Sequence, residues 1–291
     1  MRHFLDIDDL SAAELAAVLD LGEQPDPPPV LAGKGVGLVF QKPSLRTRVS
    51  MEMAVVSLGG HPVALQDFEV GLDRREPAGD VGRVLSQYCS LLGARVFAHD
   101  AIERMAAAAT VPVINLLSDQ AHPCEVLGDL LVLRRHLGSL AGRTLAWVGD
   151  GNNVCQSLLA GAALVGLTVR VACPSGYEPS AASLANAGSL VTQDPAEAVD
   201  GADAVYTDVW TSMGQESEGA DRRHDFAGFT VDEAMMARAH PDAVFLHCLP
   251  AHRGEEVSAT VIDGPASVVW EQAAARMHAQ RGLLWWLAEQ R

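Results

Sequence analysis

Lysine is almost absent from this chain of 291 residues, with only Lys34 and Lys42 present. The 21 basic side chains are therefore nearly all arginines, and 37 acidic side chains outnumber them to give a formal net charge of −16. A generic binder of nucleic acid or of an anionic membrane carries a basic surface, so this balance argues against both kinds of partner. Any clustering of the arginines becomes worth examining.

Paired cysteines and long apolar runs are missing too. The five cysteines are scattered without a C-x-x-C pair, which argues against a disulfide framework and for a reducing compartment. The amino terminus, MRHFLDIDDL, carries acids where a signal peptide has its apolar core. No run approaches the roughly 18 uncharged apolar residues of a membrane helix. We therefore expect a cytoplasmic protein with no membrane partner.

The length exceeds that of a typical single-core domain, and a hydrophobic content of 48% is enough for ordinary cores. Strand candidates alternate with helix candidates in both halves of the chain. They lie at residues 36–40, 63–66, 94–99, 111–117, 144–150, 168–174, 189–194, 204–210 and 243–249. This alternation predicts parallel sheets covered on both faces.

We accordingly expect an α/β fold with two doubly wound parallel-sheet domains. A long helix at 123–137 would join the domains, and an amphipathic helix at about 270–289 would close the chain. Other helices are expected at 11–21, from Ser44 onward, and at 81–92.

The first candidate site is the run Ser44-Leu-Arg-Thr-Arg48, which follows a buried strand and opens a helix. The first N–H groups of a helix lack partners, and its dipole is positive at that end. Two hydroxyls and two arginines added to these groups suit phosphate or another oxyanion. The alternative is a serine cap beside two surface arginines.

A second candidate is His122-Pro-Cys-Glu125, at another junction between a strand and a helix. A neutral imidazole there could donate a hydrogen bond to a substrate carbonyl, or it could simply cap the helix. The spacing of His122 and Cys124 to His247 and Cys248 matches no compact zinc-binding pattern, so we expect no metal site.

Polar residues also follow the strands of the second half. The run from Val148 to Asn153 lacks the third glycine of a dinucleotide-binding turn, so Asn152 and Asn153 could instead offer amides to a polar ligand. Asp208 could bind an ammonium group or cap the next element, and Cys248 could be a core residue. Ligands of open α/β sheets gather outside the carboxyl ends of strands, so a cleft between the domains is the better single explanation.

Six segments together resemble the aspartate/ornithine carbamoyltransferase family over nearly the whole chain. They are FQKPSLRTRVSME, HPCEVLGDL, VGDGNNV, YTDVWTSMGQE, HCLPAHRGEEV and RMHAQ. The SMG and HCLPA motifs, with DVW before them, indicate ornithine rather than aspartate as the acceptor.

The resemblance implies transfer of a carbamoyl group from carbamoyl phosphate to the δ-amine of L-ornithine, giving L-citrulline and phosphate without a cofactor or metal. It implies a carbamoyl phosphate-binding domain at 1–133, an ornithine-binding domain at 134–269, and a last helix, 270–291, that packs back on the first domain. It also implies a homotrimer with sites at subunit interfaces.

The resemblance assigns site residues in three overlapping groups. The catalytic group is Arg46, Arg95, His122, Asp208 and Cys248. The carbamoyl phosphate group is Ser44, Leu45, Arg46, Thr47, Arg95, His122, Glu125, Leu249 and Arg276. The ornithine group is Asn153, Asp208, Ser212 and Met213.

The departures from the family pattern include two positions inside the quoted motifs. Leu45 stands where relatives have a threonine, so it keeps the backbone N–H but loses a hydroxyl, and Glu125 stands where relatives have a glutamine. Glu125 could accept from the carbamoyl NH₂ group or pair with an arginine. Both departures are compatible with transfer to a different amine acceptor, or with a weakly active binding or regulatory paralogue.

Overall fold

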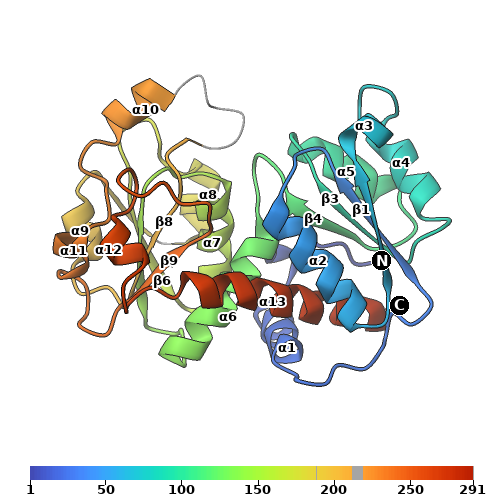
Figure 1. Cartoon of the computed structure of the whole chain (residues 1–291), viewed down its shortest axis with the longest axis horizontal. Helices are drawn as coiled ribbons and strands as arrows, with labels where there is room; N and C mark the ends of the chain where they lie inside the picture. Colours follow the sequence, from blue (N-terminus) through green and yellow to red (C-terminus); the bar gives the residue numbers. More distant parts are fainter. Residues whose placement is uncertain (188, 212–218, 291) are drawn as a thin grey trace. The chain divides into compact units, whose positions relative to one another are not determined.

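The computed structural model describes residues 1–187, 189–211 and 219–290 (Figure 1). The chain divides into two compact units, Met1–Leu131 with Ala274–Arg291, and Val132–Ala273. In sequence, the division falls inside helix α6 (Pro123–Leu137) and helix α13 (Val269–Glu289). In the described ranges, no helix is both long and apolar enough to cross a membrane.

The first unit contains a parallel four-stranded sheet in the order β2-β1-β3-β4. Its strands are β1 (Gly35–Phe40), β2 (His61–Gln66), β3 (Leu91–Arg95) and β4 (Val113–Leu117). Its remaining helices are η1 (Ile7–Asp9), α1 (Ala12–Gly22), α2 (Leu45–Ser57), α3 (Asp67–Val70), α4 (Ala78–Leu85) and α5 (His99–Ala108). The chain adds β2 on one side of β1 and then returns to add β3 on the other. The strand order therefore reverses between β1 and β3.

The second unit contains a parallel five-stranded sheet in the order β7-β6-β5-β8-β9. Its strands are β5 (Thr144–Val148), β6 (Thr168–Ala172), β7 (Leu190–Thr192), β8 (Ala204–Thr207) and β9 (Val244–His247). Its helices are α7 (Asn153–Val165), α8 (Ala181–Ala187), α9 (Pro195–Val199), α10 (Gly219–Asp225), α11 (Glu233–Met236) and α12 (Ala259–Ile262). Here the strand order reverses between β5 and β8, which is where open sheets place their ligands.

The expected α/β class with two parallel sheets is confirmed. Strands β3, β4, β8 and β9 are buried along their whole length, because helices cover parallel sheets on both faces. Such strands appear in a sequence as short continuous apolar runs, which is why the alternation could be recognised.

One stretch of the first unit differs from the expectation. We expected a helix at 81–92 and a strand at 94–99, whereas α4 ends at Leu85 and β3 occupies Leu91–Arg95. Leu91 and Leu92 pair with Val36 and Gly37 of β1, and both leucines are fully buried. Leu91 and Leu92 continue the helical spacing of apolar residues in the sequence. They nevertheless belong to a strand, because they pair with the neighbouring strand β1. The correction moves Arg95 to the carboxyl end of β3.

Helix α2 begins at a serine cap, as its sequence predicts, since the Ser44 hydroxyl accepts a hydrogen bond from the Thr47 amide at 3.2 Å. The outer side of the helix is unusually apolar. Leu45 is 77% exposed, and Val49, Met53 and Val56 are each 48% exposed. These four residues recur every three or four positions, so they form one stripe along the helix, the α2 stripe.

Candidate active site

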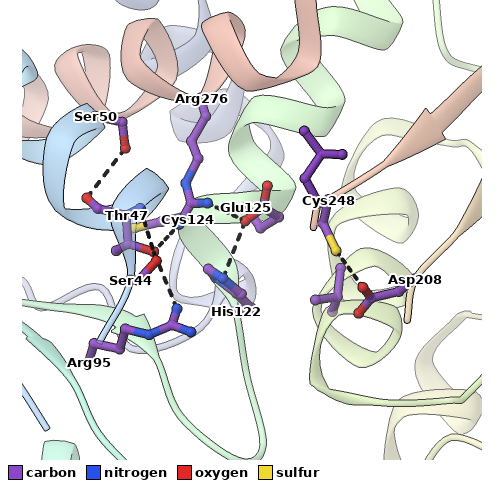
Figure 2. A network of polar contacts seen from close by, with 12 residues as sticks. Ser44, Thr47, Ser50, Arg95, His122, Cys124, Glu125, Asp208, Cys248 and Arg276 are labelled. Atoms are coloured by element: carbon purple, nitrogen blue, oxygen red, sulfur yellow. Dashed lines mark hydrogen bonds and ion pairs between the residues drawn. The ribbon is translucent and has the colours of Figure 1, made fainter. Parts of the chain in front are cut away.

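Two arginines converge on a buried hydroxyl at the start of α2 (Figure 2). The Thr47 hydroxyl accepts hydrogen bonds from Nη1 of Arg95 at 3.2 Å and from Nη2 of Arg276 at 2.7 Å. The Ser44 hydroxyl donates to the same oxygen at 3.0 Å. One oxygen atom is therefore the meeting point of donors from the start of α2, the end of β3 and the last helix.

The sheet topology explains part of this convergence. The loop after β1 leads to Ser44, and Arg95 is the last residue of β3, the strand next to β1. Arg276 arrives from α13 because that helix packs closely on α6 at Gly128. A Cβ atom at Gly128 would lie 2.8 Å from the Cα atom of Arg276, so only glycine allows this approach.

A carboxylate lies among these positive charges. Glu125 in the first turn of α6 accepts Nη1 of Arg276 at 2.6 Å, and the same oxygen lies 3.3 Å from Nε2 of His122. Arg95, His122, Glu125 and Arg276 are all at most 8% exposed. We call Ser44, Thr47 and these four residues the cationic cluster.

Burial and nearby charge keep the histidine neutral. Desolvation lowers the pKa of His122 well below its usual value, and the charges of Arg276, Arg95 and Arg46 lower it further. A neutral imidazole can donate one hydrogen bond to a carbonyl without adding a charge.

Cys124, between His122 and Glu125, is a core residue rather than a nucleophile. It is fully buried, and its thiol donates to the carbonyl oxygen of Asn115 at 3.4 Å. Burial raises the pKa of the Cys124 thiol to about 12, so the reactive thiolate is suppressed.

A second polar group lies at the strand reversal of the other unit. Asp208 follows β8, and its Oδ2 atom accepts from the side-chain amide of Asn152, which caps α7 after β5, at 2.7 Å. Its Oδ1 atom accepts from the thiol of Cys248, which follows β9, at 2.7 Å. We call Asn152, Asp208 and Cys248 the Asp208 cluster.

A buried pair supports the turn that carries Cys248. Nδ1 of His247 accepts from the backbone N–H of Leu249 at 2.8 Å, and Nε2 lies 3.0 Å from Glu256. The side chains of His247 and Glu256 are fully buried. Leu249 has φ +58, a left-handed conformation that costs about 1 kcal/mol or more for a leucine and needs such support.

Two groups of side chains in the described part of the chain offer potential metal ligands within 4.8 Å of one another. They are Asp208 with His247 and Cys248, and His252 with Glu255 and Glu256. In the first, both ring nitrogens of His247 already have partners. In the second, one oxygen of Glu256 already accepts from His247 and from the His252 amide. The structure thus shows other partners for ligand atoms in both groups.

The structure brings together most of the residues that the sequence singles out. Six of them form the cationic cluster, and Arg46 is partly buried and near enough for its charge to act on His122. Leu45, by contrast, is largely exposed. In the other unit Asp208 meets Cys248, Leu249 follows, and Asn153 is the first residue of α7. Ser212 and Met213 lie outside the described residues.

Two contacts were not predicted from the sequence. Asn152 was considered with Asn153 as a donor of an amide to a ligand, but its hydrogen bond to Asp208 was not expected. The cap position of Asn152, directly before an apolar helix, was the available signal. The pairing of His247 with Glu256 leaves no signal in the sequence, because histidine next to cysteine suggests a metal equally well.

Comparisons with known proteins match both parts of the chain to one family. Residues 2–135 match the carbamoyl-P binding domain of aspartate/ornithine carbamoyltransferase, and residues 141–287 match the Asp/Orn binding domain. An ornithine carbamoyltransferase of Acidothermus cellulolyticus is 49% identical, with 99% of this chain and 97% of the relative aligned.

Solved structures give the same result. The ornithine carbamoyltransferase of Thermus thermophilus superposes with a TM-score of 0.93 at 47% identity over 99% of each chain. An N-acetyl-L-ornithine transcarbamylase superposes with a TM-score of 0.86 at 32% identity, covering 98% of this chain and 99% of that one. Both family models and these full-length alignments show that the chain belongs to the aspartate/ornithine carbamoyltransferase family.

Proposed function

We propose that this protein is an ornithine carbamoyltransferase, which transfers the carbamoyl group of carbamoyl phosphate to the δ-amine of L-ornithine and forms L-citrulline and phosphate. The observation that carries the proposal is the convergence of Arg95 and Arg276 on Thr47 at the start of α2. Thr47 and Arg95 lie in the part of the chain that matches the carbamoyl-P binding domain, and Arg276 lies in the part that matches the Asp/Orn binding domain. The names of the full-length relatives support ornithine as the acceptor.

In this proposal the first unit binds the donor. Phosphate oxygens take the N–H groups at the start of α2, including that of Leu45, together with the Ser44 and Thr47 hydroxyls and the side chain of Arg46. Arg276 reaches the same ligand. The exposed side chain of Leu45 does not obstruct this role, because only its backbone is needed.

The chemistry is attack of the neutral δ-amine on the carbamoyl carbon. A tetrahedral intermediate forms, negative charge grows on the former carbonyl oxygen, and the C–O bond to phosphate then breaks. Arg95 and neutral His122 donate hydrogen bonds to that oxygen, which stabilises the transition state more than the ground state. The proton lost by the amine is taken up by the departing phosphate, or by Asp208 or Cys248 of the second unit.

The second unit holds the acceptor. Asp208 pairs with the α-ammonium group of ornithine, while Asn153, Ser212 and Met213 serve its carboxylate and ammonium groups. Cys248 and Leu249 lie beside the reacting amine. Deprotonating a lysine-like amine at pH 7 costs roughly 4–5 kcal/mol, so its surroundings must favour the neutral form.

For the assembly we propose a homotrimer. The α2 stripe supports an interface between copies of the chain, since four large apolar side chains on one helix face are more than a monomer usually leaves in water. The number of three copies comes from the family resemblance.

The test is citrulline formation by the purified protein supplied with carbamoyl phosphate and ornithine. Arg46→Ala should abolish it, whereas Arg48→Ala should not, because Arg48 makes an exposed pair with Glu52. Phosphate release with N-acetyl-ornithine or another amine, but not with ornithine, would reassign the acceptor. Donor binding without turnover on any amine would indicate a regulatory paralogue.

A further inference from the structure

A carboxylate at the centre of an anion-binding cluster is the feature that the proposed chemistry does not explain. Arg46, Arg95 and Arg276 supply the positive charge that a phosphate group needs. Glu125 subtracts one unit of that charge from within, at 2.6 Å from Arg276 and 6% exposed at its side chain. Burying a carboxylate is unfavourable unless it is paired, and Arg276 supplies a paired charge for Glu125.

The geometry gives Arg276 two tasks. Its Nη1 atom binds Glu125 and its Nη2 atom binds Thr47, so one guanidinium links the carboxylate to the hydroxyl at the start of α2. The charge that Arg276 offers to a ligand at Thr47 is therefore partly neutralised by Glu125. The same carboxylate also faces Nε2 of His122.

We propose that Glu125 is the internal counter-anion of the cationic cluster, a positioning residue whose carboxylate competes with phosphate for Arg276 and weakens phosphate binding. The proposal rests on the proposed function, because it takes a phosphate-bearing donor as the ligand. Phosphate is also the product, so the same competition favours its release. Glu125 thereby weakens binding of the donor and makes release of the product easier.

The experiment uses inorganic phosphate as the probe, titrated calorimetrically into the full-length protein. Glu125→Gln keeps the size of the side chain and an oxygen for Arg276, but removes the charge. We expect phosphate to bind at least about tenfold more tightly to this variant, since one charge has been removed within ion-pair distance. Glu125→Asp keeps the charge, so its phosphate affinity should remain within about threefold of the parent's.

A matched control is available on α1. Glu14 also lies in the first turn of its helix, where it completes a capping box with Ser11. Glu14→Gln removes one charge at the same helical position, away from the cationic cluster, and should leave phosphate affinity unchanged. Stronger inhibition of citrulline formation by added phosphate, seen in Glu125→Gln alone, would give the same answer kinetically.

A second pair of variants covers the case in which Glu125→Gln does not fold. Arg276→Gln should weaken phosphate binding strongly, because it removes a positive charge and leaves Glu125 without that partner. The double variant Glu125→Gln with Arg276→Gln should recover at least part of the loss relative to Arg276→Gln. A structural role for Glu125 predicts the opposite, a further loss in the double variant.

The outcomes separate the two proposals. Phosphate binding that is unchanged or weaker in a folded Glu125→Gln, or no recovery in the double variant, would overturn the counter-anion role and leave the proposed function standing. Binding of neither phosphate nor carbamoyl phosphate by the parent protein would overturn both.

Discussion

Thr47 is the residue on which the hydrogen bonds of the candidate site converge. Its hydroxyl oxygen is the shared acceptor of two guanidinium groups and of Ser44, and the residue is fully buried. Removing the oxygen leaves buried N–H donors without the acceptor that orients them, which costs about 1–3 kcal/mol for each unsatisfied group. Both arginines thus share one acceptor, and Arg276 is also held by its ion pair with Glu125.

Replacing Thr47 with valine tests the role of this shared acceptor. Valine has almost the same shape but no hydroxyl, so Arg95 and Arg276 lose their common partner. We expect citrulline formation to fall by about 100-fold or more, as for loss of one preorganised donor set. Thr47→Ser, which keeps the oxygen, should stay within about tenfold of the parent. Full activity in the valine variant would show that the arginines are held by other contacts.

His122 makes stability depend on pH in a predictable direction. Its folded-state pKa lies well below the unfolded value of 6.5, so between those two values the unfolded chain binds a proton that the native chain does not. Its contribution to stability is present above about pH 6.5 and is lost as the pH falls towards the folded pKa, by up to about 1.4 kcal/mol per pH unit.

Melting temperatures measured from pH 7.5 to 5 should therefore fall more steeply for the parent than for His122→Gln. The comparison between the two proteins removes the contribution of the carboxylates that titrate in both. Parallel curves would mean that His122 takes up its proton at an ordinary pH in the native state.

At the scale of elements, close helix packing delivers Arg276 to the cationic cluster. Helices α6 and α13 approach at Gly128, and α13 approaches α1 at Gly282, where a Cβ atom would lie 2.2 Å from the Val18 carbonyl oxygen. Neither contact tolerates a side chain without movement of the backbone. The spacing of the helices is thus part of the site.

Gly128→Ala should push α13 away from α6 and shift Arg276. We expect a loss of stability of about 1–3 kcal/mol, typical of overpacking, together with reduced citrulline formation. Gly79→Ala on α4 is the control, since its Cβ atom would meet only ordinary contacts at 3.4 Å and beyond. Denaturant unfolding of both variants measures the difference, and equal stabilities would argue against a tight helix contact.

The strands and the starts of helices were predictable because their signals are local. Continuous apolar runs identified the strands, and Ser44 and His122 were recognised at helix starts. The helix proposed at 81–92 was wrong in its second half, because Leu91 and Leu92 are fixed by pairing with β1 rather than by their neighbours in sequence. The spacing of apolar residues in the sequence cannot distinguish the last turn of a helix from the start of a strand.

Side-chain partners were less predictable than elements. Arg276 bonds to Thr47 across 229 positions of sequence, and only the family resemblance suggested that they act together. Pairing with an arginine was one of two options for Glu125, and its geometry was needed to choose between them. Asn152 and Asn153 are equivalent in a pattern, and the structure was needed to show that Asn152 donates its side-chain amide to Asp208.

For the whole molecule, the proposed trimer gives the α2 stripe a role. Met53 lies in the middle of the stripe, and a glutamate there would place a charge in the proposed interface. We expect Met53→Glu to shift the mass measured by light scattering from that of a trimer to that of a smaller species. A trimer that persists in this variant, or a parent protein that is monomeric, would place the interface elsewhere or remove it.

The first unit is built from the two ends of the chain, since Ala274–Arg291 completes what Met1–Leu131 begins. This arrangement has a consequence for synthesis on the ribosome. The start of α2 and the end of β3 are synthesised early, whereas Arg276 follows Thr47 by 229 positions and is synthesised much later. A polypeptide whose synthesis stops before α13 therefore lacks Arg276 and cannot form the complete cationic cluster.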